Sequence, residues 1–183
     1  MKAPLPANEN ERLKALYWYG ILDTIAEEIF DDLTLLASQF CETPIALISL
    51  VDKDRQWFKS KIGLTTAETP RSISFCSHAI LQSDVFEVKD AMKDERFADS
   101  PLVTNDPRIR FYAGAPIRTA EGFALGSLCV IDQVPRELTP KQTESLKLLS
   151  NIVARLFKQR RYIKELEGIV SESGATELVG NLR

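Results

Sequence analysis

The sequence predicts an α+β fold in which pairs of antiparallel strands are covered by helices. Residues 45–62 and 109–132 each contain two runs of apolar or small residues joined by a short polar turn, the pattern of a β-hairpin. Residues 26–40 and 140–157 instead repeat apolar side chains every three or four positions, as amphipathic helices do. Together these observations favour an antiparallel sheet with helices packed on it.

Length and composition indicate one soluble globular domain with extensions. The chain has 183 residues, of which 44% are hydrophobic and 27% charged, and domains commonly hold ~100–150 residues. We expect residues 1–7 to be a disordered arm and residues 8–160 to form the domain. Residues 161–183 are expected to be a C-terminal helix extension that ends in a flexible tail from residue 171.

The charge and hydropathy of the chain exclude several classes of partner. A net charge of −3 creates no basic field, so we do not expect nucleic acid to bind. No run approaches the ~18 apolar residues of a membrane span, and the N-terminus lacks the apolar core of a signal peptide. We therefore expect a cytoplasmic protein that does not associate with membranes.

Cysteine and histidine are too few and too scattered for most metal or nucleophile chemistry. Cys41, Cys76 and Cys129 lie far apart among apolar neighbours, which predicts reduced buried thiols rather than disulfides or a metal cluster. A His-rich metal site, or a Ser/His or Cys/His catalytic pair, would have to use His78, the single histidine. We expect no metal site and no catalytic residue.

The N-terminal part of the chain predicts two helices. The first begins after Asn8, an expected N-cap, and ends at Gly20. Its apolar stripe consists of Leu13, Leu16 and Tyr17. The second helix, residues 26–40, is expected to cover one face of the sheet with a stripe of six residues: Ile29, Phe30, Leu33, Leu36, Ala37 and Phe40.

The next segment predicts a hairpin with a central strand and an edge strand. Residues 45–51 are almost wholly apolar, as in a buried strand, and residues 55–62 follow a tight turn. The second strand carries Lys59 beside Trp57 and Phe58, and this mixture suggests an edge strand in which the two aromatic rings serve packing. Residues 65–70 are expected to form a polar loop.

Between the two hairpins the sequence predicts small elements and one long loop. Residues 74–81 are expected to form a short helix capped by Ser72 or Ser74, and residues 85–88 a brief strand. Residues 90–108 are polar with two prolines. A loop of this length in a compact domain is usually functional, as a lid or a binding loop.

Residues 111–118 and 123–131 predict a hairpin that is apolar on both faces. An antiparallel sheet open to water would alternate apolar and polar residues, so this hairpin should be a central pair covered on both sides. Gly122 is expected to serve the turn. Gly114 and Gly126 are expected to let another element approach the sheet closely.

The C-terminal segment predicts a long helix with two kinds of face. Thr139 caps it, and residues 140–157 carry a broad apolar face for the sheet: Leu146, Leu148, Leu149, Ile152, Val153 and Leu156. Beyond residue 157, Ile163, Leu166 and Val170 continue at coiled-coil spacing among charged residues. A thin apolar seam of this kind needs a partner helix, so we expect a homodimer.

Several phrases of the sequence, in their order, resemble one family. They are ISLVDKDRQWFKSKIGL, SISFCSHAIL, VKDAMKDERFADSPLV, IRFYAGAPI and GFALGSLCVID, and the similarity covers residues 11–160. The chain resembles the GAF domains found at the front of bacterial sensor histidine kinases and diguanylate cyclases. The resemblance implies a profilin-like central antiparallel sheet of five or six strands. It also implies helices on one face, with pocket-forming loops and a short helix on the other.

The resemblance also implies a role in signal transduction. GAF domains bind cyclic nucleotides, tetrapyrroles, haem, amino acids or other small molecules, and they dimerise through their first and last helices. We therefore expect a non-catalytic sensor domain that binds an unidentified small molecule, with a histidine kinase or diguanylate cyclase as its partner. The alternatives are a dimerisation or docking module without ligand and, more remotely, a Cys-dependent redox enzyme or a bilin photosensor.

The resemblance indicates which residues would border such a pocket, and the apolar seam of the C-terminal helix together with the resemblance indicates a dimer interface. The expected ligand-binding residues are Phe75, Cys76, His78, Asp90, Phe97, Arg108, Phe111, Tyr112 and Ser127. The expected dimer interface consists of Leu13, Leu156, Ile163, Leu166 and Val170. Among the ligand-binding residues, Arg108 could clamp an anion. Tyr112 is favoured because a buried hydroxyl needs a partner.

The motifs of specific ligands within the family are incomplete here. Ser77 separates Cys76 from His78, whereas the main bilin-anchoring pattern has His directly after Cys, so neither bilin nor haem is expected. The cyclic-nucleotide pattern has an Asn-Lys pair upstream of a Phe, and Asp-Glu four residues after that Phe. Phe86 and Asp90 keep the second spacing, but Ala91 replaces the Glu and no Asn-Lys pair precedes them. The three cysteines lack the spacing of methionine-sulfoxide-reductase GAF enzymes, which leaves one thiolate without an evident resolving partner.

Overall fold

The structure, a computed structural model, describes residues 2–180, with side chains for residues 2–170. Within this part of the chain, a six-stranded antiparallel sheet has the order β3-β2-β1-β6-β5-β4. The strands are β1 Ile45–Val51, β2 Arg55–Ile62, β3 Glu68–Pro70, β4 Phe86–Val88, β5 Phe111–Arg118 and β6 Ala124–Asp132. The helices are α1 Glu9–Tyr19, α2 Glu28–Cys41, α3 Cys76–Ala79, α4 Pro101–Thr104 and α5 Pro140–Gly180, with a 3-10 turn at Arg71–Ile73. The predicted α+β class and strand number are confirmed.

The hairpin of β5 and β6 lies inside the sheet, as its two apolar faces predict. β6 pairs with β5 on one side and with β1 on the other. A Cβ on Gly126 would come within 1.9 Å of the backbone oxygen of Ser49 on β1. The predicted close approach at Gly126 is therefore confirmed, and the element that approaches is the neighbouring strand.

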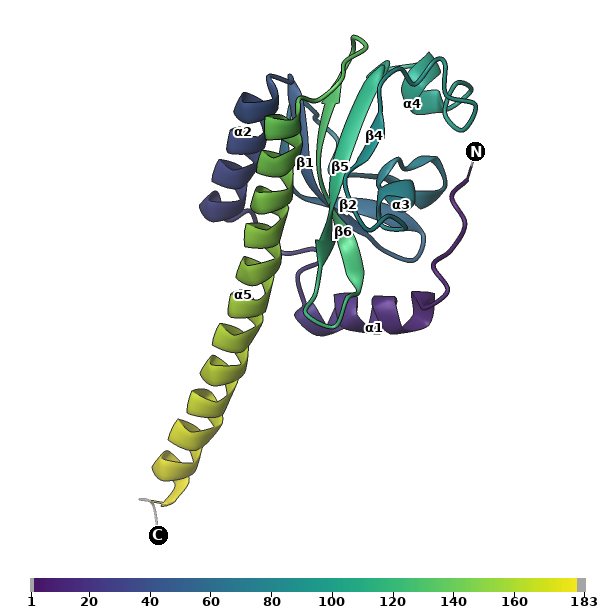
Figure 1. The fold of residues 1–183 in the computed structure, drawn as a ribbon. Coiled ribbons are helices and arrows are strands. Elements are labelled where there is room, and N and C mark those ends of the chain that lie inside the picture. Colours follow the sequence, from purple (N-terminus) through teal and green to yellow (C-terminus); the bar gives the residue numbers. More distant parts are fainter. Residues whose placement is uncertain (1, 181–183) are drawn as a thin grey trace.

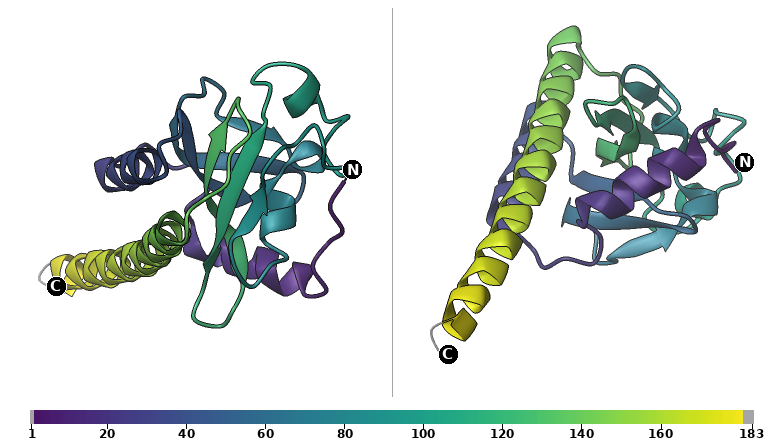
Figure 2. Two further views of the ribbon diagram at one scale, coloured as in Figure 1. Left: turned by 45° about the horizontal axis from the view of Figure 1, so that its top comes forward. Right: turned by 90° about the horizontal axis from the view of Figure 1, so that it is seen from below.

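Helices α2 and α5 cover one face of the sheet side by side (Figure 1 and Figure 2, left). Phe30 of α2 and Phe157 of α5 meet with ring centroids 5.3 Å apart in the helix-side core. Helix α1 lies across one end of the sheet and adds Leu16 and Tyr19 to the same core. The opposite face carries α3 and the long segment before β5, which enclose a second, separate core.

Strand β2 differs from its prediction as an edge strand. β3, within the predicted polar loop, pairs outside it, with Gln56 opposite Thr69. Lys59, whose charge suggested an edge strand, is buried. Its ammonium contacts three oxygens from the segment before α2 instead of water. A buried cation with such partners is compatible with an interior strand.

The predicted apolar faces of the helices are wider than the surfaces that they bury. On α2, Ile29 and Phe40 are about half exposed, and so are Leu148 and Ile152 on α5. The expectation that these residues cover the sheet is wrong. Only some of the apolar residues of α2 and α5 face the sheet, and these four lie on the exposed side of their helices. On α1, Tyr17 is likewise exposed, and its hydroxyl hydrogen-bonds Asp52 at the surface.

Arg12 takes a buried position on α1 that an apolar residue would be expected to hold. It is 1% exposed, and its guanidinium makes two hydrogen bonds of 2.8 Å to the carboxylate of Glu9. Arg71 reaches the same carboxylate at 2.5 Å. One carboxylate thus joins two arginines and ties α1 to the turn before α3.

Helix α5 runs beyond the body of the domain (Figure 1). Its 41 residues correspond to a rod of ~60 Å. The backbone stays helical to Gly180, so the flexible tail that we expected from residue 171 is wrong for residues 171–180. The last three residues of that expected tail, 181–183, lie outside the described part of the chain. Among the described helices, none combines the length and hydropathy needed to cross a membrane.

Candidate functional site

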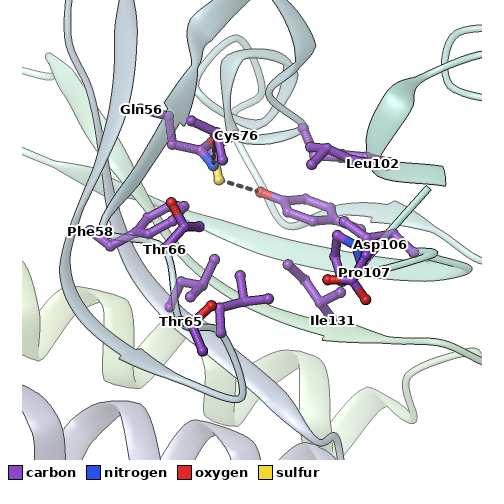
Figure 3. Close-up of a pocket in the computed structure, with 15 residues that line it drawn as sticks. Gln56, Phe58, Thr65, Thr66, Cys76, Leu102, Asp106, Pro107 and Ile131 are labelled. Atoms are coloured by element: carbon purple, nitrogen blue, oxygen red, sulfur yellow. Dashed lines mark hydrogen bonds between the residues drawn. The ribbon is translucent and has the colours of Figure 1, made fainter. Parts of the chain in front are cut away.

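A cavity of about 250 Å³ opens on the face of the sheet opposite α2 and α5 (Figure 3). Its floor comes from alternate strand positions, because successive residues of a strand point to opposite faces. The floor residues are Leu47, Phe58, Tyr112 and Ile131. Phe58 thus faces the cavity, whereas its neighbour Trp57 belongs to the helix-side core.

The walls of the cavity come from segments far apart in the sequence. Phe75 and Cys76 stand at the start of α3 on one side. Gln56 of β2 also lines the cavity, and the chain from the end of β2 through β3 and from α4 to the start of β5 supplies Leu64, Thr65, Thr66, Thr69, Leu102, Asp106, Pro107 and Ile109. The long loop therefore contributes only its last part, which includes α4, rather than its whole length.

Few polar groups reach the cavity, and their hydrogen bonds orient them. Gln56 donates from Nε2 to the hydroxyl of Thr69 at 3.2 Å and accepts from the hydroxyl of Ser74 at Oε1. Asp106 adds a carboxylate, and Thr65 and Thr66 add hydroxyls. Among the described lining residues none is lysine or arginine. The cavity therefore offers hydrogen bonds and one negative charge, without a cation to bind an anion.

A buried hydrogen-bond network lies beneath the cavity, around Cys76. The hydroxyl of Tyr112 donates to Cys76 Sγ at 3.2 Å and lies 3.2 Å from the hydroxyl of Ser127 (Figure 3 shows the first contact). Cys76 Sγ also lies 3.8 Å from Cys129 Sγ on β6. The expectation that a thiolate would lack an evident resolving partner does not hold for Cys76, because the fold places Cys129 beside it although the two are distant in the sequence.

The pKa values of the two thiols in this network are shifted in opposite directions. Burial raises the pKa of the Cys76 thiol, but the polar groups around it, with Cys129 and the hydroxyl of Tyr112 in direct contact, lower it by more, to about 6. Burial raises the pKa of Cys129 well above its usual value, and burial also raises the pKa of Tyr112. Cys76 is therefore the more acidic of the two thiols, while Cys129 keeps its proton.

Gly114 allows Tyr112 to reach this network. A Cβ at Gly114 would come within 2.3 Å of the Tyr112 hydroxyl oxygen and 2.8 Å of its ring. The side chain of Tyr112 thus lies over the position where another residue would place its Cβ. The prediction that another element approaches the sheet at Gly114 is wrong, because the group that lies against Gly114 is the Tyr112 side chain of the same strand.

Aromatic rings support the wall from behind. Phe75 stacks on Phe97 with a centroid distance of 4.0 Å and an interplanar angle of 10°. His78 meets Phe97 edge-on at 4.8 Å and stacks on Phe86 at 6.1 Å. Phe97 therefore supports Phe75, and His78 supports Phe97, but neither Phe97 nor His78 is among the residues that line the cavity.

The structure brings only three of the predicted ligand-binding residues to the cavity surface: Phe75, Cys76 and Tyr112. Ser127 lies behind Tyr112, and Arg108 is exposed at the end of the long loop. Asp90 forms an ion pair with Lys93 at 3.1 Å, at a different surface groove. Phe111 lies in the helix-side core, because it neighbours Tyr112 on β5 and points to the other face.

The lining residues that sequence reasoning missed are mostly on loops. Thr65, Leu102 and Asp106 have no periodic pattern that would mark them. The alternation of the strands carried a usable signal, since Gln56 and Phe58 share one face of β2, and Cys129 and Ile131 share one face of β6.

The predicted dimer residues also separate into two groups. Ile163, Leu166 and Val170 are exposed on α5, and Leu156 is partly buried. Leu156 and Ile163 line a groove with Ile29 of α2. Leu13 lies apart from them, in a groove beside the N-terminal arm that includes Leu5 and Arg71.

A family model for the GAF domain matches residues 26–156, which include the sheet and the cavity. The chain belongs to the GAF domain family. Within residues 2–170, no group of three or more His, Cys, Asp or Glu side chains is placed to hold a metal ion.

This GAF domain is similar in sequence to part of a longer bacterial enzyme. It is 47% identical over 170 residues to a cyclic di-GMP phosphodiesterase of Pseudomonas aeruginosa. The match covers 91% of this chain and 29% of that relative, so the chain spans less than a third of the relative's length.

Solved structures of low sequence identity share the fold. The GAF domain of an Acinetobacter phosphoenolpyruvate-protein phosphotransferase matches with a TM-score of 0.63 at 15% identity, covering 87% of this chain and 98% of that one. A free methionine-R-sulfoxide reductase from Neisseria meningitidis matches with a TM-score of 0.61 at 14% identity, covering 88% of this chain and 98% of that one. These two likenesses concern the fold alone.

Proposed function

We propose that this GAF domain is a non-catalytic cytoplasmic sensor that binds a small molecule in the cavity and signals through α5. The observation that carries the proposal is the cavity itself, an apolar space of about 250 Å³ with a few oriented polar groups. Ligand sites are typically apolar concavities of ~300–1,000 Å³ with a small number of placed polar groups. A volume just below that range favours a small ligand.

The charge of the lining indicates the class of ligand. Burying a phosphate without a cationic partner is costly, and neither lysine nor arginine occurs among the described lining residues. A neutral molecule, or a cation that pairs with Asp106, meets no such penalty. We therefore propose a neutral or cationic ligand with an apolar body that contacts Phe58 and Phe75, rather than a cyclic nucleotide.

The exit of α5 provides a route for the signal. Arg160 of α5 donates to Glu27 Oε1 at 2.8 Å, and Lys59 of β2 donates to the same oxygen at 2.7 Å. β2 also carries Gln56 and Phe58 of the cavity. A ligand that contacts two arrangements of β2 differently would shift their populations and thereby the position of α5.

The output partner is proposed from the curated relative. That protein is named as a cyclic di-GMP phosphodiesterase, and this chain matches only a fraction of its length. We propose that this domain regulates an enzyme of cyclic-dinucleotide turnover, with a histidine kinase as the other candidate. We further propose a homodimer, which would bring two α5 helices together.

Mass spectrometry tests the ligand proposal directly. Under native conditions, the purified chain is expected to carry extra mass that disappears on denaturation. Leu102→Trp fills the cavity from its wall and should abolish that mass, whereas Leu35→Trp makes the same change on the exposed surface of α2 and should not. The proposal would be contradicted if the native and denatured masses were equal and if no added neutral or cationic compound bound to the chain.

A second function is favoured by the exposed apolar side chains of α2 and α5. Ile29, Phe40, Leu148 and Ile152 leave a large hydrophobic area uncovered in the single chain. The domain would then serve dimerisation or partner docking without a ligand. An empty cavity combined with a stable dimer is the result expected for this alternative.

A further inference from the structure

We propose that Cys76 and Cys129 form an oxidisable thiol pair beneath the cavity, and that a peroxide-class oxidant converts the pair to a disulfide. The proposal does not rest on ligand binding, although Cys76 also lines the cavity. Both cysteines are free and buried, and their sulfurs lie 3.8 Å apart although 53 positions separate them in the sequence. A disulfide bond of ~2.05 Å requires the sulfurs to approach by roughly 1.8 Å.

The two sulfurs differ in their access to the cavity. Cys76 is one of the cavity-lining residues, whereas Cys129 is fully buried on β6 behind it. A small oxidant that enters the cavity therefore meets Cys76 first. Cys129 is then in place to attack the oxidised sulfur, as a resolving thiol does.

The surroundings of Cys76 favour a nucleophilic sulfur. Tyr112 donates to its sulfur at 3.2 Å, and Ser127 lies 3.2 Å from the same hydroxyl. The Tyr112 hydroxyl stabilises negative charge on sulfur and supports the lowered pKa of Cys76 described above. No such environment surrounds Cys41, which lies in the helix-side core, where burial raises its pKa to about 11.

The chemistry consumes one peroxide for each disulfide. The Cys76 thiolate attacks the outer peroxide oxygen, so that an S–O bond forms while the O–O bond breaks and an alcohol, or water from hydrogen peroxide, leaves after protonation. The Cys129 sulfur then attacks the sulfenic sulfur, forming S–S while the S–O bond breaks, and the proton of the Cys129 thiol leaves with the sulfenic oxygen as water. In total the two thiols lose two electrons and two protons, which the peroxide takes up.

Disulfide formation would alter the cavity. Cys76 is the first residue of α3 and follows Phe75, so drawing its sulfur toward β6 moves the wall formed by both residues. It also removes the thiolate that accepts the Tyr112 hydrogen bond. Oxidation is therefore expected to change the shape and polarity of the same cavity that the proposed ligand occupies.

Peptide mapping of the full chain tests the proposal. After hydrogen peroxide treatment, we expect the intact mass to fall by two hydrogens per chain, and after alkylation and digestion we expect a linked peptide pair containing Cys76 and Cys129. Cys129→Ala should stop at a Cys76 sulfenic acid, seen as one added oxygen that dimedone traps. Cys41→Ala, the matched control, should still form the disulfide.

Alkylation rates provide a measurement that needs no variant. In the reduced protein, Cys76 is expected to react at least about 10-fold faster than Cys41, because the thiolate is the reactive form. A Cys76 that alkylates as slowly as Cys41 and stays unlinked after peroxide would overturn the proposal, and so would a disulfide between two chains. None of these results depends on a bound ligand, so failure here leaves the ligand proposal separately testable.

Discussion

Lys59 of β2 places its ammonium 2.7 Å from Glu27 Oε1 while its own side chain is completely buried. Arg160 of α5 shares that oxygen at 2.8 Å. Burial raises the pKa of Glu27, but hydrogen bonds from Lys59 and Arg160 lower it by more. One carboxylate therefore joins the sheet, the start of α2 and the helix that leaves the domain.

Removing this carboxylate should destabilise the domain. Glu27→Gln leaves the buried ammonium of Lys59 without an anion, and breaking a buried ion pair from one side costs ~3–5 kcal/mol. Because Glu27 is 30% exposed, we expect a smaller loss of about 1–3 kcal/mol in the free energy of unfolding from urea denaturation. Glu28→Gln changes the exposed neighbour and should have little effect. Equal stabilities of both variants would contradict this role.

Acid should weaken the link between α1 and the turn before α3. Burial raises the pKa of Glu9, but Arg12 and Arg71 lower it by more, from 4.5 to about 2. A depressed carboxyl pKa adds stability above the unfolded-state value, and this stability is lost as the pH falls from about 4.5 to about 2.

The contribution of Glu9 can be isolated by comparing stabilities at two pH values. We expect Glu9→Gln to cost about 2 kcal/mol at pH 7 and progressively less as the pH falls toward 2. Glu11→Gln, on the exposed side of the same helix, should leave the pH profile unchanged. A Glu9→Gln penalty that stayed constant down to pH 2 would show that the ionised carboxylate is not what stabilises the contact.

Gly114→Ala should disturb Tyr112 and the thiol network. The new Cβ would lie 2.3 Å from the Tyr112 hydroxyl, so the ring has to move away from Cys76. Overpacking of this kind costs ~1–3 kcal/mol. In a Tyr112→Ala background the same substitution should cost much less, because the nearest atoms belong to Tyr112. Additive effects in this double-mutant cycle would rule out the clash.

The seam on α5 should control association. Ile163, Leu166 and Val170 are 55%, 62% and 70% exposed in the single chain and repeat at coiled-coil spacing. Leu166→Glu places a charge in that seam and should reduce the sedimentation mass from dimer to monomer. Lys164→Glu introduces the same side chain outside the seam and should leave the dimer intact. If both variants sedimented alike, the interface would lie elsewhere.

Local sequence patterns predicted the sheet well. The bounds of β1, β2 and β5 match the predicted strands, because an apolar run closed by turn residues leaves little choice of strand ends. Short β3 was missed, since three residues in a polar loop carry no periodic pattern. Its strand character comes from pairing with β2.

The candidate site was less predictable than the fold. Phe75, Cys76 and Tyr112 were correctly expected near a pocket, while Leu102 and Asp106 were not, because loop residues reach the cavity through packing rather than periodicity. Whether any of them binds a ligand stays a prediction.

By itself, the sequence determined the α+β class, the central hairpin and the long terminal helix, because periodicity and turn chemistry act over a few neighbouring residues. Only the tertiary structure decided which side chains share a cavity and which cysteines meet. Cys76 and Cys129 are brought together because α3 packs on β6, a contact between distant segments that neither sequence neighbourhood encodes. The burial of Lys59 beside Glu27 has the same origin.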